Sequence, residues 1–287
     1  AGVAGAGLAA TAATLGSGRL TTLSDGNLVL PRDFVIGDLP QTQADAALAE
    51  AGITGDTLTP PCNLTLWQDE TRTVLFDAGS GPAFMPSAGK LTEALDAAGV
   101  APGDVTHILF THAHPDHLWG VLDEFDDPMF ANASYMIGQA EWEYWTDPAT
   151  VQTIGSERVS FAVGAARRLA EIEDSVEFIG DGQEVLPGIL AHDTPGHTPG
   201  HMGFEIRQGG DAIMVVGDAI GNGHLALAHP DWASGADQDK ETGIRTRRRL
   251  LDQLAGDDMA MVGFHLPGGG LGRVERNGDA YRFVPEV

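Results

Sequence analysis

Cysteine and basic residues are scarce in this sequence, and each scarcity argues against a class of protein. Cys62 is the single cysteine among 287 residues, so no disulfide framework exists, and its place at the start of a predicted strand favours a small buried thiol. Lysine and arginine number 16 against 41 acidic residues, and the net charge of −25 disfavours binding to nucleic acid or to an anionic membrane surface. The sequence contains no unbroken run of about 18 or more apolar residues, so no membrane-spanning segment is predicted.

The first 18 residues are rich in alanine and glycine, and the first 14 of them carry no charge. This composition is similar to the apolar part of a bacterial export signal and favours a periplasmic or secreted protein. A flexible extension of a cytoplasmic protein is the alternative. Residues 19–287 are predicted to form one domain, because a hydrophobic content of 43% over this length can bury a large core.

Short apolar segments alternate with helical patterns along residues 19–287, which predicts an α/β fold. A strand pair is expected over 20–30, turned at the Ser-Asp-Gly-Asn of 24–27, a typical hairpin sequence. Further strands are predicted at 62–67, 71–77, 105–110, 134–138, 176–179, 189–192, 202–206, 212–216, 259–264, 272–276 and 280–284. Helices are predicted at 41–51, 90–98, 139–145, 157–173 and 239–254, and loops at 79–89 and 221–236.

The strongest chemical signal follows the apolar segment 105–110, where His112, His114, Asp116 and His117 lie within six residues. A buried strand that ends in such a run delivers several metal ligands to one point at the edge of a sheet. Histidine nitrogen suits Zn, Fe, Ni or Cu, and a mixed set of nitrogen and oxygen donors suits a catalytic metal better than a structural one. The run therefore predicts a catalytic metal site.

Three more candidate ligands follow predicted strands or glycine-rich turns further along the chain. His197 lies in the first of two Thr-Pro-Gly-His repeats at 194–201, Asp218 follows 212–216, and His265 follows 259–264. One edge of a sheet can gather all of them together with the first run. His201, in the second repeat, is predicted to orient its neighbours rather than bind metal.

These residues resemble the metallo-β-lactamase superfamily of dinuclear hydrolases, over roughly residues 19–287. The resemblance implies an αβ/βα four-layer sandwich, two divalent metal ions, with zinc the expected element, and a metal-bridging hydroxide as the nucleophile. It gives catalytic roles to Asp116 and Asp218. It assigns His112, His114 and His197 to one ion, Asp116, His117 and His265 to the other, and Asp218 to a bridge between them.

Within the superfamily the sequence is most similar to methyl parathion hydrolase and its lactonase and esterase relatives. The similarity is carried by residues 23–26, 140–145 and 281–285, besides the doubled Thr-Pro-Gly-His. It implies hydrolysis of neutral esters or lactones, with organophosphate triesters as further substrates. A thioester hydrolase similar to glyoxalase II and a non-catalytic metal-binding scaffold are the alternatives. The sequence does not decide between a monomer and a homodimer.

Four aromatic residues are predicted to line an apolar substrate pocket, with packing in the core as the alternative for each. They are Phe84, Trp119, Trp142 and Trp145. In relatives that open acyl-homoserine lactones, a tyrosine shortly after the bridging aspartate assists catalysis. Residues 219–222 contain no tyrosine, which makes a dedicated lactonase of that kind a weaker prediction.

Overall fold

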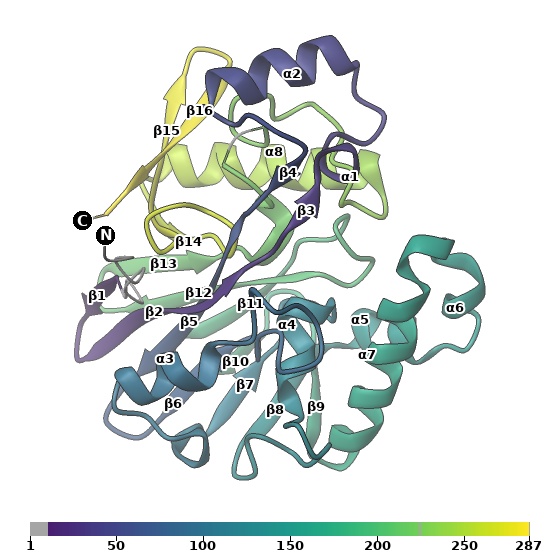
Figure 1. Cartoon of the computed structure of the whole chain (residues 1–287). Coiled ribbons are helices and arrows are strands. Elements are labelled where there is room, and N and C mark those ends of the chain that lie inside the picture. The colour runs from purple at the N-terminus through teal and green to yellow at the C-terminus, as the bar shows by residue number, and fades with distance from the viewer. Residues whose placement is uncertain (1–10, 224, 287) are drawn as a thin grey trace, which may run out of the picture.

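Two seven-stranded sheets pack face to face in the computed structural model, which describes residues 11–223 and 225–286 (Figure 1). Helices α3 (Leu91–Ala97) and α7 (Val159–Ile172) cover the outer face of the first sheet. Helix α8 (Lys240–Gly256) covers the outer face of the second. The predicted αβ/βα four-layer sandwich is confirmed.

The strand orders in the two sheets are β1-β2-β5-β6-β7-β8-β9 and β10-β11-β12-β13-β14-β15-β16. The first comprises β1 (Ala12–Leu15), β2 (Gly18–Asn27), β5 (Pro61–Gln68), β6 (Thr73–Phe76), β7 (His107–Leu109), β8 (Ser134–Gly138) and β9 (Val176–Ile179). The second comprises β10 (Glu184–Leu186), β11 (Ile189–Asp193), β12 (Met202–Gln208), β13 (Asp211–Val215), β14 (Ala260–Val262), β15 (Leu271–Asn277) and β16 (Ala280–Pro285). The remaining α-helices are α1 (Arg32–Ile36), α2 (Gln41–Glu50), α4 (Pro115–Leu118), α5 (Gln139–Thr146) and α6 (Thr150–Thr153).

The core between the sheets is built from large apolar side chains of both. Trp67 and Phe76 come from the first sheet and Phe204 from the second, and the rings of Phe76 and Phe204 lie 5.5 Å apart. Fully burying a side chain of this size contributes about 1.5–3 kcal/mol. This contact holds the two sheets together behind the strand ends that carry the candidate ligands.

Strand direction explains why those ligands meet. Strands β6, β7, β8 and β9 of the first sheet pair in parallel, and so do the neighbouring strands β13 and β14 of the second sheet. The carboxyl ends of parallel neighbours lie at one edge of a sheet, where binding sites of open α/β sheets are found. The segments after β7, β13 and β14 therefore converge at one end of the sandwich.

The hairpin predicted at 24–27 is wrong, because β2 continues through these residues. The β2–β5 register shifts between Ser24 and Asn27, so the turn-like sequence forms an irregularity within the strand. The Asp25 carboxylate accepts the backbone N–H groups of Ser80 and Leu91, both at 2.8 Å. This residue serves as a buried anchor for the neighbouring loop rather than as a turn residue.

The N-terminal tail predicted for 1–18 ends earlier than expected. Residues 12–15 form β1, which pairs with β2 through a turn that contains Gly16 in the left-handed region (φ 54°). Edge pairing to β2 satisfies the backbone of a segment whose small side chains gave no strand pattern. Residues 1–10 of the proposed export segment lie outside the described residues.

A separate segment, residues 28–58, projects from the sandwich and is called the cap below. It contains α1, α2 and the short paired strands β3 (Leu30–Pro31) and β4 (Thr57–Leu58). Val35, Leu48 and Leu58 form a small apolar cluster with Leu225 of the long loop after β13. Figure 1 shows β3 and β4 running beside the strand ends, with α2 at the far end of the cap. None of the described helices is long and apolar enough to cross a membrane.

Candidate metal centre

All seven predicted ligands are buried and lie at the converging strand ends. His112 and His114 lie in the loop after β7, and Asp116 and His117 belong to α4. The other three come from the second half of the chain: His197 precedes β12, Asp218 lies in the short 3₁₀ turn Gly217–Ile220, and His265 follows β14. Residues separated by up to 153 positions are thus brought together.

Three histidine rings form the first cluster. His114 Nδ1 lies 3.0 Å from His112 Nε2 and 2.9 Å from His197 Nε2. Tetrahedral zinc with nitrogen ligands at about 2.0–2.1 Å requires ring nitrogens a little more than 3 Å apart. These three nitrogens can hold one metal ion with small adjustments of the rings.

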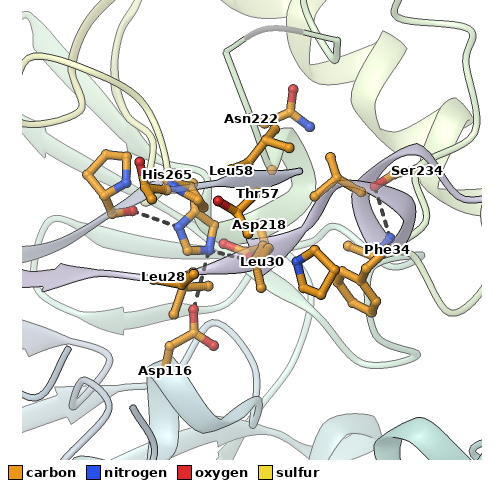
Figure 2. A pocket seen from close by; sticks show the side chains of 18 of the residues that line it. Leu28, Leu30, Phe34, Thr57, Leu58, Asp116, Asp218, Asn222, Ser234 and His265 are labelled. Atoms are coloured by element: carbon orange, nitrogen blue, oxygen red, sulfur yellow. Dashed lines mark hydrogen bonds and ion pairs between the residues drawn. The ribbon is translucent and has the colours of Figure 1, made fainter. Parts of the chain in front are cut away.

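The second cluster joins the carboxylates to the remaining two histidines. His265 Nε2 lies 3.3 Å from Asp116 Oδ2 and 3.2 Å from Asp218 Oδ2. Figure 2 shows the ring of His265 between these two carboxylates. His117 Nε2 lies 3.5 Å from Asp116 Oδ2 and 3.4 Å from Asp218 Oδ1. Since Asp218 Oδ2 is also 3.3 Å from His197 Nε2, this carboxylate lies between the two clusters.

The electrostatics of the site favour metal-binding protonation states at His112, His114 and Asp218, but not at His117 and His265. Burial lowers the pKa of His112 and His114 well below the ordinary value, so both rings are neutral. Burial opposes ionisation of Asp218, but the charges of His265 and His117 outweigh it and hold the pKa of the carboxyl well below its usual range. Neutral imidazole and ionised carboxylate are the forms that bind metal ions. Burial opposes protonation of His117 and His265, but the neighbouring carboxylates outweigh it and raise the pKa of both rings well above the ordinary value. His117 and His265 must therefore lose a proton to bind a metal ion.

Unsatisfied buried atoms provide an independent test of whether these residues fit a metal. Six buried side-chain nitrogen or oxygen atoms in the described part of the chain have no hydrogen-bond partner. Three of them are Asp116 Oδ2, His117 Nε2 and Asp218 Oδ1. Leaving a buried polar atom unpaired costs about 1–3 kcal/mol, and a divalent cation among these atoms would remove that cost. The donor set therefore fits metal ions.

Asp77 is a supporting residue that the sequence analysis missed. Its carboxylate accepts Thr111 N–H at 2.7 Å and Thr111 Oγ1–H at 2.8 Å, and it lies 2.8 Å from His117 Nδ1. A carboxylate on the far nitrogen of a metal-binding histidine fixes the ring and its tautomer. Asp77 directly follows β6, which ends at the same edge of the sheet as β7, and this position in the sequence could have identified it.

His201 explains why Thr-Pro-Gly-His occurs twice. Its Nε2 accepts the backbone N–H of Asp218 at 3.0 Å, and its Nδ1 lies 2.7 Å from Thr194 Oγ1. Burial lowers the pKa of His201 well below the ordinary value, so the ring is neutral. The first repeat contributes a donor to the cluster, and the second orients Asp218, as predicted.

Cys62 is buried, as predicted, but it also lies at the second cluster. Its Sγ, one oxygen of Asp116 and one ring nitrogen of His265 all lie within 4.8 Å of one another. Burial raises the pKa of the Cys62 thiol to about 11, although His265 acts in the opposite direction. The thiol is neutral near pH 7.

A cavity of about 590 Å³ opens onto both clusters. His114, Asp116, His197, Asp218 and His265 line one side of it. The opposite walls are mainly apolar side chains of the cap and of the following loops, among them Leu28, Leu30, Phe34, Leu58, Phe84 and Phe161. Figure 2 shows leucines of the cap strands beside Asp218 and His265.

Only Phe84 of the four predicted pocket aromatics lines this cavity. Trp119 lies behind it, with its ring 5.5 Å from that of Phe84. The Arg168 guanidinium sits 4.2 Å over the Trp119 ring, and Gly164 of α7 packs against the indole. Trp119 therefore supports the cavity wall from outside, which departs from the sequence prediction.

Trp142 and Trp145 also differ from the prediction, because α5 turns both away from the cavity. The ring of Trp142 packs against Phe178 at 5.5 Å. Trp145 is fully buried, donates its Nε1–H to Glu141 Oε1 at 2.6 Å, and packs edge-on against His114 at 5.6 Å. Aromatic residues at helical spacing did not reveal which face was buried.

The chain is similar to known proteins in both sequence and fold. Residues 58–264 match the family model of the Metallo-beta-lactamase superfamily. The uncharacterized protein YobT of Bacillus subtilis (strain 168) is 30% identical over 215 residues, which cover 67% of this chain and 79% of that protein.

Two solved structures match almost the whole chain. The dizinc quorum-quenching lactonase AidC, in complex with a product, is similar with a TM-score of 0.91 and 25% identity, over 97% of both chains. AbOPH, a hydrolase in the beta lactamase superfamily, gives a TM-score of 0.88 at 24% identity, over 97% of this chain and 98% of that one. The likeness to AbOPH concerns the fold alone.

Proposed function

The chain belongs to the metallo-beta-lactamase superfamily, and on that premise we propose that it hydrolyses neutral carboxylic esters, lactones above all, with two divalent metal ions. Zinc is the expected element. The observation that carries the proposal is the position of Asp218, between two clusters of metal donors and on the wall of an apolar cavity.

The proposed ligand assignment follows from the two clusters. Asp218 is assigned as the bridge because its two oxygens face different histidines, His117 on one side and His197 on the other. Asp116 and His265 complete the second site. His112, His114 and His197 would hold the first ion, and Asp116, His117 and His265 would hold the second.

A bound pair of ions supplies an activated water and polarises the carbonyl oxygen of the substrate. The residues of the chain define where this happens. Asp218 fixes the separation of the two sites, and Asp116 presents to the second site an oxygen that has no hydrogen-bond partner. We assign to Asp116 the orientation of the attacking water, because it lines the cavity as well as the second cluster.

The cavity supports a neutral, largely apolar substrate. Arg158 is the sole lysine or arginine among the described residues that line it, and its Nη2 already donates to the carbonyl oxygens of Gly235 and Ala236. A net charge of −25 further disfavours anionic substrates. An acyl or aryl group fits the apolar walls, while the ester or lactone carbonyl lies at the metal side.

Lactones are placed first because the similarity to the lactonase AidC extends over nearly the whole chain. Residues 219–222 after Asp218 contain no tyrosine, so this activity would not depend on a tyrosine there. Organophosphate triesters, which the narrower resemblance to methyl parathion hydrolase implies, are proposed as secondary substrates. Like lactones, they are neutral and carry an oxygen that a metal ion can polarise.

Metal content and substrate range test the proposal together. The purified chain is expected to retain about two metal ions and to hydrolyse acyl lactones and aryl esters, with slower turnover of a phosphotriester. His112→Ala should lose both metal and activity, whereas His192→Ala should keep both, because His192 is bonded to Glu205 away from the site.

Other outcomes would change the assignment. Faster hydrolysis of thioesters than of lactones would replace the proposed substrate class by that of a thioester hydrolase. Two bound metal ions without turnover of any ester, lactone, thioester or phosphotriester would indicate a metal-binding scaffold instead.

A further inference from the structure

Glu141 of α5 is a buried carboxylate without a basic partner. It has no solvent exposure, and among the described residues burial and hydrogen bonds act on it, with no ion pair to a lysine, arginine or histidine. An isolated buried carboxylate is costly unless hydrogen bonds satisfy both of its oxygens. Residues 140–145 carry part of the family resemblance, but no role was predicted for Glu141 from the sequence.

Four donors satisfy this carboxylate. Oε1 accepts the Ala113 backbone N–H at 2.9 Å and Trp145 Nε1–H at 2.6 Å. Oε2 accepts Thr198 Oγ1–H at 2.7 Å and the Gly200 backbone N–H at 3.0 Å. All four partners are donors, so the site is built for a group that only accepts.

These donors belong to the two loops that carry the first cluster. Ala113 lies between His112 and His114, and Thr198 directly follows His197. The first loop follows β7 of one sheet, and the second precedes β12 of the other. One carboxylate therefore joins the two halves of the sandwich next to all three histidines.

The surroundings of Glu141 are shaped for this contact. A Cβ on Gly200 would lie 2.0 Å from the backbone nitrogen of Glu141, so only glycine lets α5 approach the loop so closely. Trp145 adds a second connection, since its N–H reaches Glu141 while its ring packs edge-on against His114. The glutamate and the tryptophan thus support the same histidines from behind.

We propose that Glu141, assisted by Trp145, is a positioning residue that sets the spacing of His112, His114 and His197. This inference rests on the proposed function, in which these histidines hold the first metal ion. Residues that orient metal ligands typically change metal affinity about 10–100-fold when they are replaced. We expect a loss of that size, confined to the first site.

Glu141→Gln is the decisive variant, because it keeps the shape but replaces an acceptor oxygen by an NH₂ donor that faces N–H and O–H groups. Asp25→Asn is the matched control. Asp25 is also fully buried and accepts two backbone N–H groups, from Ser80 and Leu91, but neither adjoins a proposed ligand. Both variants remove a buried carboxylate, but only Glu141 is hydrogen-bonded to the loops that carry the three histidines.

The measurement is the affinity of each variant for the two metal ions, from competition with a chelator, together with the visible absorption spectrum of the Co²⁺-loaded protein. In Glu141→Gln, the affinity for one of the two ions is expected to fall about 10–100-fold, and the Co²⁺ spectrum is expected to change. Asp25→Asn should lower the unfolding temperature but leave both affinities and the spectrum as in the wild type.

Wild-type affinities and an unchanged spectrum in Glu141→Gln would overturn the inference, even if the variant is less stable. If Glu141→Gln does not fold, Trp145→Phe keeps an aromatic ring and removes one donor, and an altered Co²⁺ spectrum is then expected. An unchanged spectrum in Trp145→Phe would count against the inference in the same way. A wild-type chain that binds no metal pair would instead overturn the proposed function.

Discussion

The Asp218 backbone N–H donates to Nε2 of His201 at 3.0 Å, so the second Thr-Pro-Gly-His repeat determines where the central carboxylate lies. Gly217 makes this approach possible, because a Cβ there would lie 2.7 Å from the same ring nitrogen. Its φ of 53° is also a conformation that favours glycine. The loop before β12 and the turn after β13 are therefore fitted to each other.

Replacing His201 by alanine should displace Asp218 without removing any proposed ligand. We expect metal affinity to fall about 10–100-fold, with a matching loss of kcat at limiting metal. The measurement is a metal titration followed by lactone or aryl-ester hydrolysis. His192→Ala serves as the control, since this half-buried histidine pairs with Glu205 instead. Equal affinities in the two variants would contradict the role given to His201.

Asp218→Asn tests the bridge directly. The amide keeps the size of the side chain but removes a negative charge that faces His117, His197 and His265. If Asp218 bridges two ions, both should bind more weakly, and the metal content after dialysis should fall from about two to one or fewer. Elemental analysis of the dialysed protein measures this. Two tightly retained ions in the variant would argue against a bridging carboxylate.

Leu30 of the cap should affect the binding of long acyl chains. It lines the cavity, so Leu30→Ala removes apolar contact area without touching the metal donors. A methylene-sized change in an apolar pocket alters discrimination by about 1–3 kcal/mol, which corresponds to a factor of about 10–200 in kcat/KM. We therefore expect a loss of about tenfold or more for a hexanoyl substrate and little change for an acetyl ester.

Comparison of kcat/KM for the two esters measures the effect. Val163→Ala, at an exposed position of α7, is the control for truncating an apolar residue. Equal losses for the two esters in Leu30→Ala would mean that the acyl chain binds away from the cap.

Most of the proposed ligands could be predicted from the sequence because they directly follow apolar segments. The end of an apolar pattern marks the end of a strand, where ligand side chains are expected. The single sheet edge predicted to gather them is wrong, because His112 follows β7 of the first sheet and His265 follows β14 of the second. The packing of the two sheets, which the sequence pattern did not reveal, brings these strand ends together. Asp77 and Glu141 were missed because their roles depend on contacts between strand ends that are far apart in the sequence. A carboxylate after a strand or on a helix has the same pattern whether it faces solvent or a ligand loop.

The aromatic residues show a second limit of sequence reasoning. Helix α5 carries Trp142 and Trp145 at i and i+3, a spacing that identifies a common apolar side but not what covers it. The buried Glu141 carboxylate decided the orientation, because it needs the Trp145 N–H as a donor. The helix predicted at 41–51 is α2 of the cap, but the cap strands β3 and β4 were not predicted, since they contain too few residues to form a recognisable pattern.

The thiol of Cys62 should react slowly in the folded, metal-free protein. Alkylation requires the thiolate, and burial raises the pKa of this thiol to about 11, above its usual value of 9.0. Below about pH 10 the folded chain should therefore be labelled by iodoacetamide far more slowly than the unfolded chain. The same shift in pKa affects stability. As the pH rises above 9.0, the thiol ionises in the unfolded chain before it does in the folded chain, so the free energy of unfolding falls.

Labelling rates measured by mass spectrometry between pH 7 and pH 10, with and without urea, test this expectation. Cys62→Ser provides the blank, because no second cysteine exists to react. Rapid labelling of the folded, metal-free chain at pH 7 would show an ionised or exposed thiol and contradict the burial at the second cluster. Since the thiol lies close to Asp116 and His265, protection by added Zn²⁺ would further indicate that the ion binds beside it.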